Sequence, residues 1–126
     1  MPEYRRVRID GATVFITVVT FDRMPIFTSP TSLQILGDAW RRVAKQRPFT
    51  TDAVCLLPDH IHTLITLPKG DVDYSLRIRD IKRLFTTEYL AIFGETTPRN
   101  RSRINKKEAT VWQRRFWEHT IKDEDD

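Results

Sequence analysis

Hydrophobic and polar positions alternate along the chain with two different periods, and the shorter period predicts four strands. Residues 12–21 (ATVFITVVTF) carry β-branched and aromatic side chains on both faces, which indicates a central strand. Residues 52–57 and 60–67 have the same character, and only two residues separate them. Because so short a connection closes an antiparallel hairpin, these two strands should pair. Residues 110–121 (TVWQRRFWEHTI) predict the fourth strand.

The longer period, in which apolar side chains recur every three or four positions, predicts two helices. The first covers residues 30–47, with Thr28 or Ser29 as its N-cap. The second covers residues 75–93, with Ser75 as its N-cap.

The resulting order is strand, helix, strand, strand, helix, strand, which is the ferredoxin-like βαββαβ arrangement of the α+β class. We expect one domain over residues 1–126, with a four-stranded antiparallel sheet and two helices on one face. Residues 122–126 (KDEDD) form an acidic cluster that suits the first turn of another helix. We expect that this C-terminal helix is missing and that the chain is truncated before it; the alternative is a frayed acidic tail.

Composition narrows the class of protein. Of the 126 residues 40% are hydrophobic and 30% are charged, with a formal net charge of +4 and a pI of about 9.5. A basic excess of this size permits a polyanionic partner. The chain shows no apolar run of membrane-spanning length and no signal peptide at its start. The single cysteine, Cys55, is interpreted as a small buried side chain. We expect a cytoplasmic protein without a membrane partner, and we favour a monomer.

The cations are placed where a nucleic acid could use them. Between Arg99 and Arg115 there are seven cationic side chains and one acid, and aromatic residues interleave with the last cations at Trp112, Phe116 and Trp117. Single-stranded nucleic acid needs this mixture of charge and stacking surface. We predict phosphate contacts from a set of cations in this region and at the N-terminus, where a plain solvated arm is the alternative: Arg5, Arg6, Arg99, Arg101, Arg103, Lys106, Lys107, Arg114 and Arg115.

A second group of cations crowds the start of the second predicted helix, at Arg77, Arg79, Lys82 and Arg83. Cations near a helix start oppose the helix dipole, so helix propensity does not account for them. A phosphate partner would account for these cations, and we predict DNA contacts from Arg79, Lys82 and Arg83. A plain solvated helix face is the alternative.

Two histidines lie one residue apart in the third predicted strand. Strand side chains alternate between faces, so His60 and His62 should project from the same face, where two imidazoles form half of a metal site. Asp59 could orient one ring. The third histidine, His119, is a further candidate ligand, although a structural or DNA-contacting role is the stronger interpretation. Two ordinary histidines on a half-buried strand are the alternative to a metal site.

Several stretches together resemble a known family. They are Tyr4-Arg5-Arg6, residues 15–20 (FITVVT), residues 57–62 (LPDHIH) and residues 112–119 (WQRRFWEH). A histidine-hydrophobe-histidine motif on a central strand of a ferredoxin-like sheet is the mark of the HUH single-strand DNA nucleases. Within that superfamily the chain resembles the REP-associated tyrosine transposases, and the resemblance covers essentially all of it.

The resemblance implies a concrete activity. Such enzymes bind single-stranded DNA with a REP-type hairpin, hold Mg²⁺ or Mn²⁺ on the two histidines, and cleave and rejoin DNA through a 5′-phosphotyrosine. On this chain His60 and His62 match the metal ligands. The family's nucleophile lies on a helix after the last strand, and none of Tyr4, Tyr74 and Tyr89 matches its place. We therefore assign no catalytic residue and expect cleavage to be lost.

Two other classes of function stay open from the sequence. One is a DNA-binding remnant without chemistry. The other is an RNA-binding ferredoxin-like domain, which would need exposed aromatic residues on the two central strands. Phe15 qualifies for that role, but the third predicted strand carries His60 and His62 where a second stacking aromatic residue would be wanted.

Overall fold

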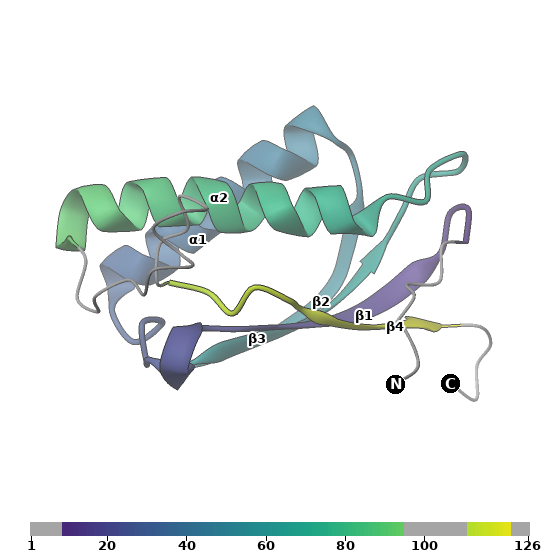
Figure 1. Cartoon of the computed structure of the whole chain (residues 1–126). Helices are drawn as coiled ribbons and strands as arrows, with labels where there is room; N and C mark the ends of the chain where they lie inside the picture. Colours follow the sequence, from purple (N-terminus) through teal and green to yellow (C-terminus); the bar gives the residue numbers. More distant parts are fainter. Residues whose placement is uncertain (1–8, 95–110, 122–126) are drawn as a thin grey trace.

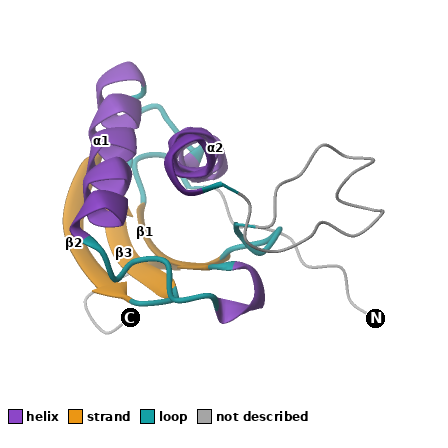
Figure 2. Cartoon of the chain, turned by 90° about the vertical axis from the view of Figure 1, so that its left-hand side faces the viewer, coloured by secondary structure: helices purple, strands orange, loops and turns teal. Residues whose placement is uncertain are grey.

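The computed structural model describes residues 9–94 and 111–121, and it places two helices against one face of a single sheet (Figure 1). The elements in chain order are β1 (Thr13–Val19), the short 3-10 turn η1 (Phe21–Arg23), α1 (Pro30–Gln46), β2 (Thr50–Leu57), β3 (His60–Thr66), α2 (Tyr74–Phe93) and β4 (Trp117–Ile121). Figure 2 shows α1 and α2 on the same side of the sheet. The predicted βαββαβ fold is confirmed.

The sheet has the order β2-β3-β1-β4, and every neighbouring pair is antiparallel. The two most apolar strands, β1 and β3, therefore occupy the centre, as the composition of residues 12–21 predicts. Val14 and Ile16 of β1 and Ile65 of β3 are fully buried beneath the helices. Burying each such side chain contributes roughly 1.5–3 kcal/mol, so this layer fixes which face of the sheet is covered.

The two helices begin at different kinds of cap. Ser29 Oγ accepts a hydrogen bond from the backbone N–H of Ser32 at 3.1 Å, which satisfies one free donor at the start of α1. The predicted cap of the second helix at Ser75 is wrong. Asp73 Oδ1 accepts from the N–H of Leu76 at 3.0 Å, because α2 begins one residue before Ser75, at Tyr74.

The last strand is shorter than predicted. β4 contains only Trp117–Ile121, and before it Trp112 forms an isolated bridge to Thr20. The backbone N–H of Gln113 donates to Val19 at 2.9 Å, but the carbonyl of Gln113 accepts from Lys82 Nζ of α2 rather than from a strand. The Lys82 side chain of α2 thus takes the place of a neighbouring strand as the hydrogen-bond partner of Gln113, and the residues just before β4 are irregular.

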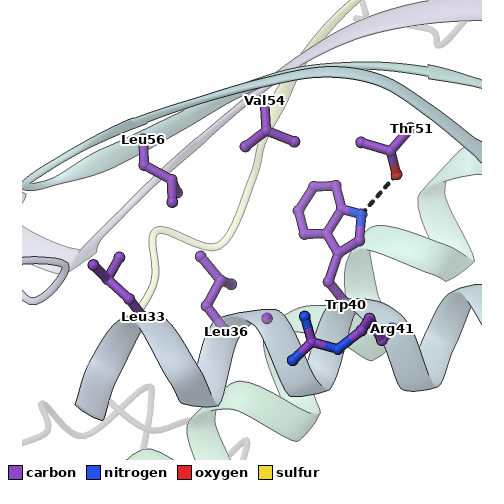
Figure 3. A pocket seen from close by; sticks show the side chains of 8 residues that line it. Leu33, Leu36, Trp40, Arg41, Thr51, Val54 and Leu56 are labelled. Carbon is purple, nitrogen blue, oxygen red and sulfur yellow. Dashed lines mark hydrogen bonds between the residues drawn. The ribbon is translucent and has the colours of Figure 1, made fainter. Parts of the chain in front are cut away.

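The helix α1 does not cover the edge strand β2 completely, and an apolar groove of about 240 Å³ lies between them (Figure 3). Leu33 and Leu36 of α1 lie opposite Leu56 and Val54 of β2. Trp40 Nε1 donates to Thr51 Oγ1 at 2.9 Å. This groove is on the helix side of the sheet. Neither helix of the described structure is long and apolar enough to cross a bilayer.

Candidate metal centre and nucleic-acid interface

The face of the sheet opposite the helices carries the predicted metal ligands. Directly paired residues of neighbouring antiparallel strands share a face, so the strand register gives a map of it. One row runs from Trp117 of β4 through Thr17 of β1 and His62 of β3 to Cys55 of β2. The next row towards the hairpin holds His60, so the two histidines lie on one face as predicted.

The two imidazoles lie together, with their ring centroids 4.7 Å apart. Nδ1 of His62 hydrogen bonds with Thr17 Oγ1 at 2.8 Å, and Nδ1 of His60 donates to Asp59 Oδ1 at 2.6 Å. Because a carboxylate only accepts, Nδ1 of His60 carries a hydrogen, and in the neutral ring the lone pair is therefore on Nε2. His62 is in the same state when its Nδ1 donates to Thr17. The arrangement leaves one ligand atom on each ring.

The hairpin that presents His60 is held by the segment that follows β1. Arg23 Nε lies 2.9 Å from Asp59 Oδ2, while the backbone N–H of Thr20 donates to the Asp59 carbonyl at 3.0 Å. The hydrogen bond from His60, supported by Arg23, lowers the pKa of the Asp59 carboxyl, so it is ionised at neutral pH. Asp22 and Arg23 both have positive φ, at 53° and 50°, a conformation that side chains other than glycine rarely adopt. The turn η1 thus aims Arg23 at the hairpin.

His119 lies on the same face as the histidine pair but not next to it. It pairs with Phe15 of β1, and β1 separates β4 from β3. The backbones of β4 and β3 are therefore two strand spacings apart, which is roughly 10 Å. In residues 9–94 and 111–121 there is no cluster of three or more His, Cys, Asp or Glu side chains that could hold a metal. The structure therefore brings His60 and His62 together and leaves His119 apart.

The interpretation of Cys55 as a buried side chain is wrong. Cys55 is exposed, because β2 is an edge strand and this residue points away from the helices, beside His62. The run of apolar neighbours around it suggested a core position, but both faces of this edge strand are open to solvent.

The cations of α2 have separate roles. Arg77 is buried and donates to the carbonyls of Arg47, Pro48 and Asp73 and to the carboxylate of Asp71. It joins the start of α2 to the end of α1, so a structural role accounts for this cation without a phosphate partner. The carbonyls of Arg47 and Pro48 are distant from Arg77 in sequence, and the helix pattern gave no sign of these contacts.

The three α2 cations predicted to contact DNA also differ from one another. Lys82 Nζ donates to the Gln113 carbonyl at 2.9 Å and so holds the segment that precedes β4. Arg79 and Arg83 are exposed on the helix layer, each within 4 Å of Asp80. Because the helices and the histidines lie on opposite faces of the sheet, the structure does not bring these arginines to the candidate metal centre.

Of the other cations predicted to contact DNA, the structure describes only two. Arg114 and Arg115 are exposed just before β4. Arg5, Arg6, Arg99, Arg101, Arg103, Lys106 and Lys107 lie outside the described residues.

The interleaved aromatic residues do not share one environment. Trp112 and Phe116 belong to the core, whereas Trp117 is 64% exposed. Trp112 packs against Phe27 and Phe85, so it is not available for stacking on a ligand.

Neither described tyrosine is placed as a nucleophile. Tyr74 is 1% exposed at the start of α2. Tyr89 is buried among Phe85 and Phe93, and burial raises the pKa of its hydroxyl. A raised pKa disfavours the phenolate, and both residues lie on the helix side of the sheet. Tyr4 lies outside the described residues.

Comparison with known proteins gives a consistent family. Residues 9–126 match the family described as "Transposase IS200 like". A REP-associated tyrosine transposase of Escherichia coli (strain K12) is 38% identical over 126 residues, all of this chain and 66% of that protein. A Haemophilus influenzae protein that carries the same name is 37% identical over all of this chain and 69% of its own length. The chain thus spans about two thirds of the length of these relatives.

Solved structures agree. A REP-associated tyrosine transposase bound to a REP hairpin matches with a TM-score of 0.76 and 37% identity, over 99% of this chain and 65% of that one. A Deinococcus radiodurans protein described as a transposase matches with a TM-score of 0.62 at 15% identity, over 97% of this chain and 87% of that one, which supports the fold alone.

A ferredoxin-like sheet with a histidine pair on a central strand is the arrangement that the sequence resemblance to the HUH nucleases implied. Within that class, the chain belongs to the IS200-like transposase family.

Proposed function

We propose that this chain binds single-stranded DNA with a REP-type hairpin and holds a divalent metal ion on His60 and His62. The observation that carries the proposal is the pairing of the two rings. Each ring is held by a hydrogen bond at Nδ1, which leaves its Nε2 as the atom that would bind the metal. Ligating histidines in proteins almost always have their second ring nitrogen held in this way. Two ordinary surface histidines would not need two separate partners from two different segments.

The chemistry of the donor set fits Mn²⁺ better than Mg²⁺. Imidazole nitrogen suits the softer ion, whereas Mg²⁺ prefers an all-oxygen shell, so DNA phosphate and water would have to complete the site. Such an ion would polarise a phosphate of the bound strand. The role of the chain's own residues is to orient the rings through Thr17 and Asp59 and to hold the hairpin through Arg23.

The DNA partner is supported by the family and by charge. The structural neighbour is bound to a REP hairpin, and the chain has a net charge of +4. The family reaction is cleavage and joining of strands through a phosphotyrosine. Because Tyr74 and Tyr89 are buried on the helix side, and Tyr4 does not match the place of the family's nucleophile, we propose that none of the three tyrosines performs it and that these 126 residues bind DNA without cleaving it.

The metal is tested first by thermal denaturation. Mn²⁺ should raise the melting temperature of the wild-type chain, and His60→Ala with His62→Ala should abolish the rise. His119→Ala is the matched control, because this histidine shares the face but not the pair, and its variant should keep the full shift. An equal rise in all three proteins would refute a site on the pair.

The DNA partner is tested with a labelled REP-type hairpin that carries a single-stranded tail, in the presence of Mn²⁺. We expect a shift on a native gel and no covalent adduct on a denaturing gel. A covalent adduct would contradict the assignment of the tyrosines, and the absence of any native shift would refute DNA binding by this chain.

A further inference from the structure

Two aromatic side chains on the helix-free face are exposed to solvent. Trp117 is 64% exposed and Phe15 is 37% exposed, although both belong to regular strands. The other two tryptophans are used internally, since Trp40 donates to Thr51 and Trp112 donates to Thr86. Leaving a large ring in water forgoes the free energy of burial, so a ligand for this surface is the natural explanation.

The register places the two rings beside the candidate metal centre. Trp117 pairs with Thr17, the residue that hydrogen bonds with His62. Phe15 is two residues away on β1, which makes it a diagonal neighbour of Trp117, within reach of a large side chain. The Phe15 ring is also stacked on His62, with centroids 5.5 Å apart and planes 18° apart. The aromatic surface and the histidine pair are therefore continuous.

We propose that Phe15 and Trp117 form a stacking platform for unpaired bases of a DNA strand whose phosphate lies at His60 and His62. This inference rests on the proposed function and adds the site that takes the bases. An unpaired base fits because it offers a flat π-face, whereas the bases of a duplex are stacked on one another. The charge is complementary, since Arg115 is exposed two residues before Trp117.

The distances across the sheet suit one strand of DNA that bridges both sites. Trp117 and His62 are two strands apart, or roughly 10 Å. A base stacked on Trp117 therefore belongs to the nucleotide bound at the histidines or to a nucleotide close to it in sequence. The platform would accept any base, because every base has a π-face, and so it would favour single strands without choosing a sequence.

The test is tryptophan fluorescence with two DNA probes, a REP-type hairpin with a single-stranded tail and the same hairpin with a blunt end. The tailed probe should quench the emission of Trp117, and the quenching should persist in Trp40→Phe and disappear in Trp117→Leu. The affinity of Trp117→Leu and of Phe15→Leu for the tailed probe should fall about ten- to a hundredfold, the range expected for one lost stacked base. Trp117→Tyr should restore most of the affinity.

The blunt hairpin separates this inference from the function on which it rests. Trp117→Leu should bind it as the wild-type chain does, because the blunt probe offers no unpaired base. If the tailed probe binds the wild-type and leucine variants equally, the platform is refuted while DNA binding stands. If neither probe binds the wild-type chain, the proposed function fails and the platform fails with it. Concentration-dependent self-association that Trp117→Leu abolishes would also overturn the proposal, because a second copy would then occupy the platform.

Discussion

At the scale of single residues, the candidate metal centre depends on two hydrogen bonds of different kinds. His60 is fixed by Asp59, its neighbour in sequence and an ionised carboxylate, whereas His62 is fixed by the neutral hydroxyl of Thr17 on another strand. Loss of either partner frees one ring to rotate. Thr17 is the more informative residue to change, because Asp59 also binds Arg23 and belongs to the hairpin itself.

We predict that Thr17→Val lowers Mn²⁺ affinity about ten- to a hundredfold, as is typical when the partner of a ligating histidine is removed. Valine keeps the shape of the side chain and the strand, so stability should change little. Thr17→Ser should retain most of the affinity. Isothermal titration with Mn²⁺ measures both variants. Equal affinity in Thr17→Val would show that stacking on Phe15, rather than the hydroxyl, orients His62.

The residue scale also shows what the sequence could predict. His60 and His62 were assigned to one face from strand alternation alone, since that argument needs only local periodicity. The role of Thr17 could not be found in this way, because it depends on the register between β1 and β3. The exposure of Cys55 was missed for a related reason, since an apolar run does not show whether its strand lies at an edge.

At the scale of elements, the junction between α1 and α2 depends on one buried cation. Arg77 donates to two carbonyls at the end of α1, and its charge is balanced by Asp71 at 2.8 Å. The hydrogen bond from Arg77 lowers the pKa of Asp71 to about 2, from an ordinary value of 3.8. The helix pattern predicted both helices but not this junction, because residues 47 and 77 are distant in sequence.

Asp71 should therefore make stability depend on pH in a defined direction. A carboxyl whose pKa is lower in the folded state stabilises the fold above its unfolded value, and the contribution is lost as the pH falls towards its folded value. We predict that Asp71→Asn lowers the free energy of unfolding by about 1 kcal/mol at pH 7, a modest figure because solvent reaches this side chain. The deficit relative to wild type should shrink as the pH falls from about 4 to about 2.

Urea denaturation at a series of pH values measures this effect. Asp38→Asn is the matched control, because Asp38 also pairs with an arginine, Arg41, but both side chains are mostly exposed. Its variant should stay within about 0.5 kcal/mol of wild type at every pH. A deficit in Asp71→Asn that persists unchanged at pH 3 would mean that the carboxylate charge is not what stabilises the junction.

At the scale of the whole molecule, the sheet divides the chain into two faces with different chemistry. The histidine pair, Phe15 and Trp117 lie on the helix-free face, whereas Arg79 and Arg83 lie on the helix layer and share Asp80. The fold class and the order of the elements along the chain followed from the sequence, because most of the elements have a clear period. The sequence did not predict which cations lie on the same face of the sheet as the histidines, because a position in the sequence does not show on which side of the sheet a side chain lies.

This division predicts that the two groups of cations contribute unequally to DNA binding. Each phosphate contact that is lost should flatten the dependence of log K on log salt by about 0.7 for a single strand. Changing Arg79 and Arg83 to Gln should alter that slope little, because a strand held at His60 and His62 runs along the opposite face.

Changing Arg99, Arg101, Arg103, Lys106 and Lys107 to Gln should weaken binding and flatten the slope if that segment contacts phosphates, as the sequence predicts. Binding titrations of the tailed hairpin between 50 and 200 mM salt, roughly the range over which such contacts are usually resolved, compare the two variants. A larger loss from the α2 pair would place the DNA on the helix layer and contradict the assignment of the helix-free face.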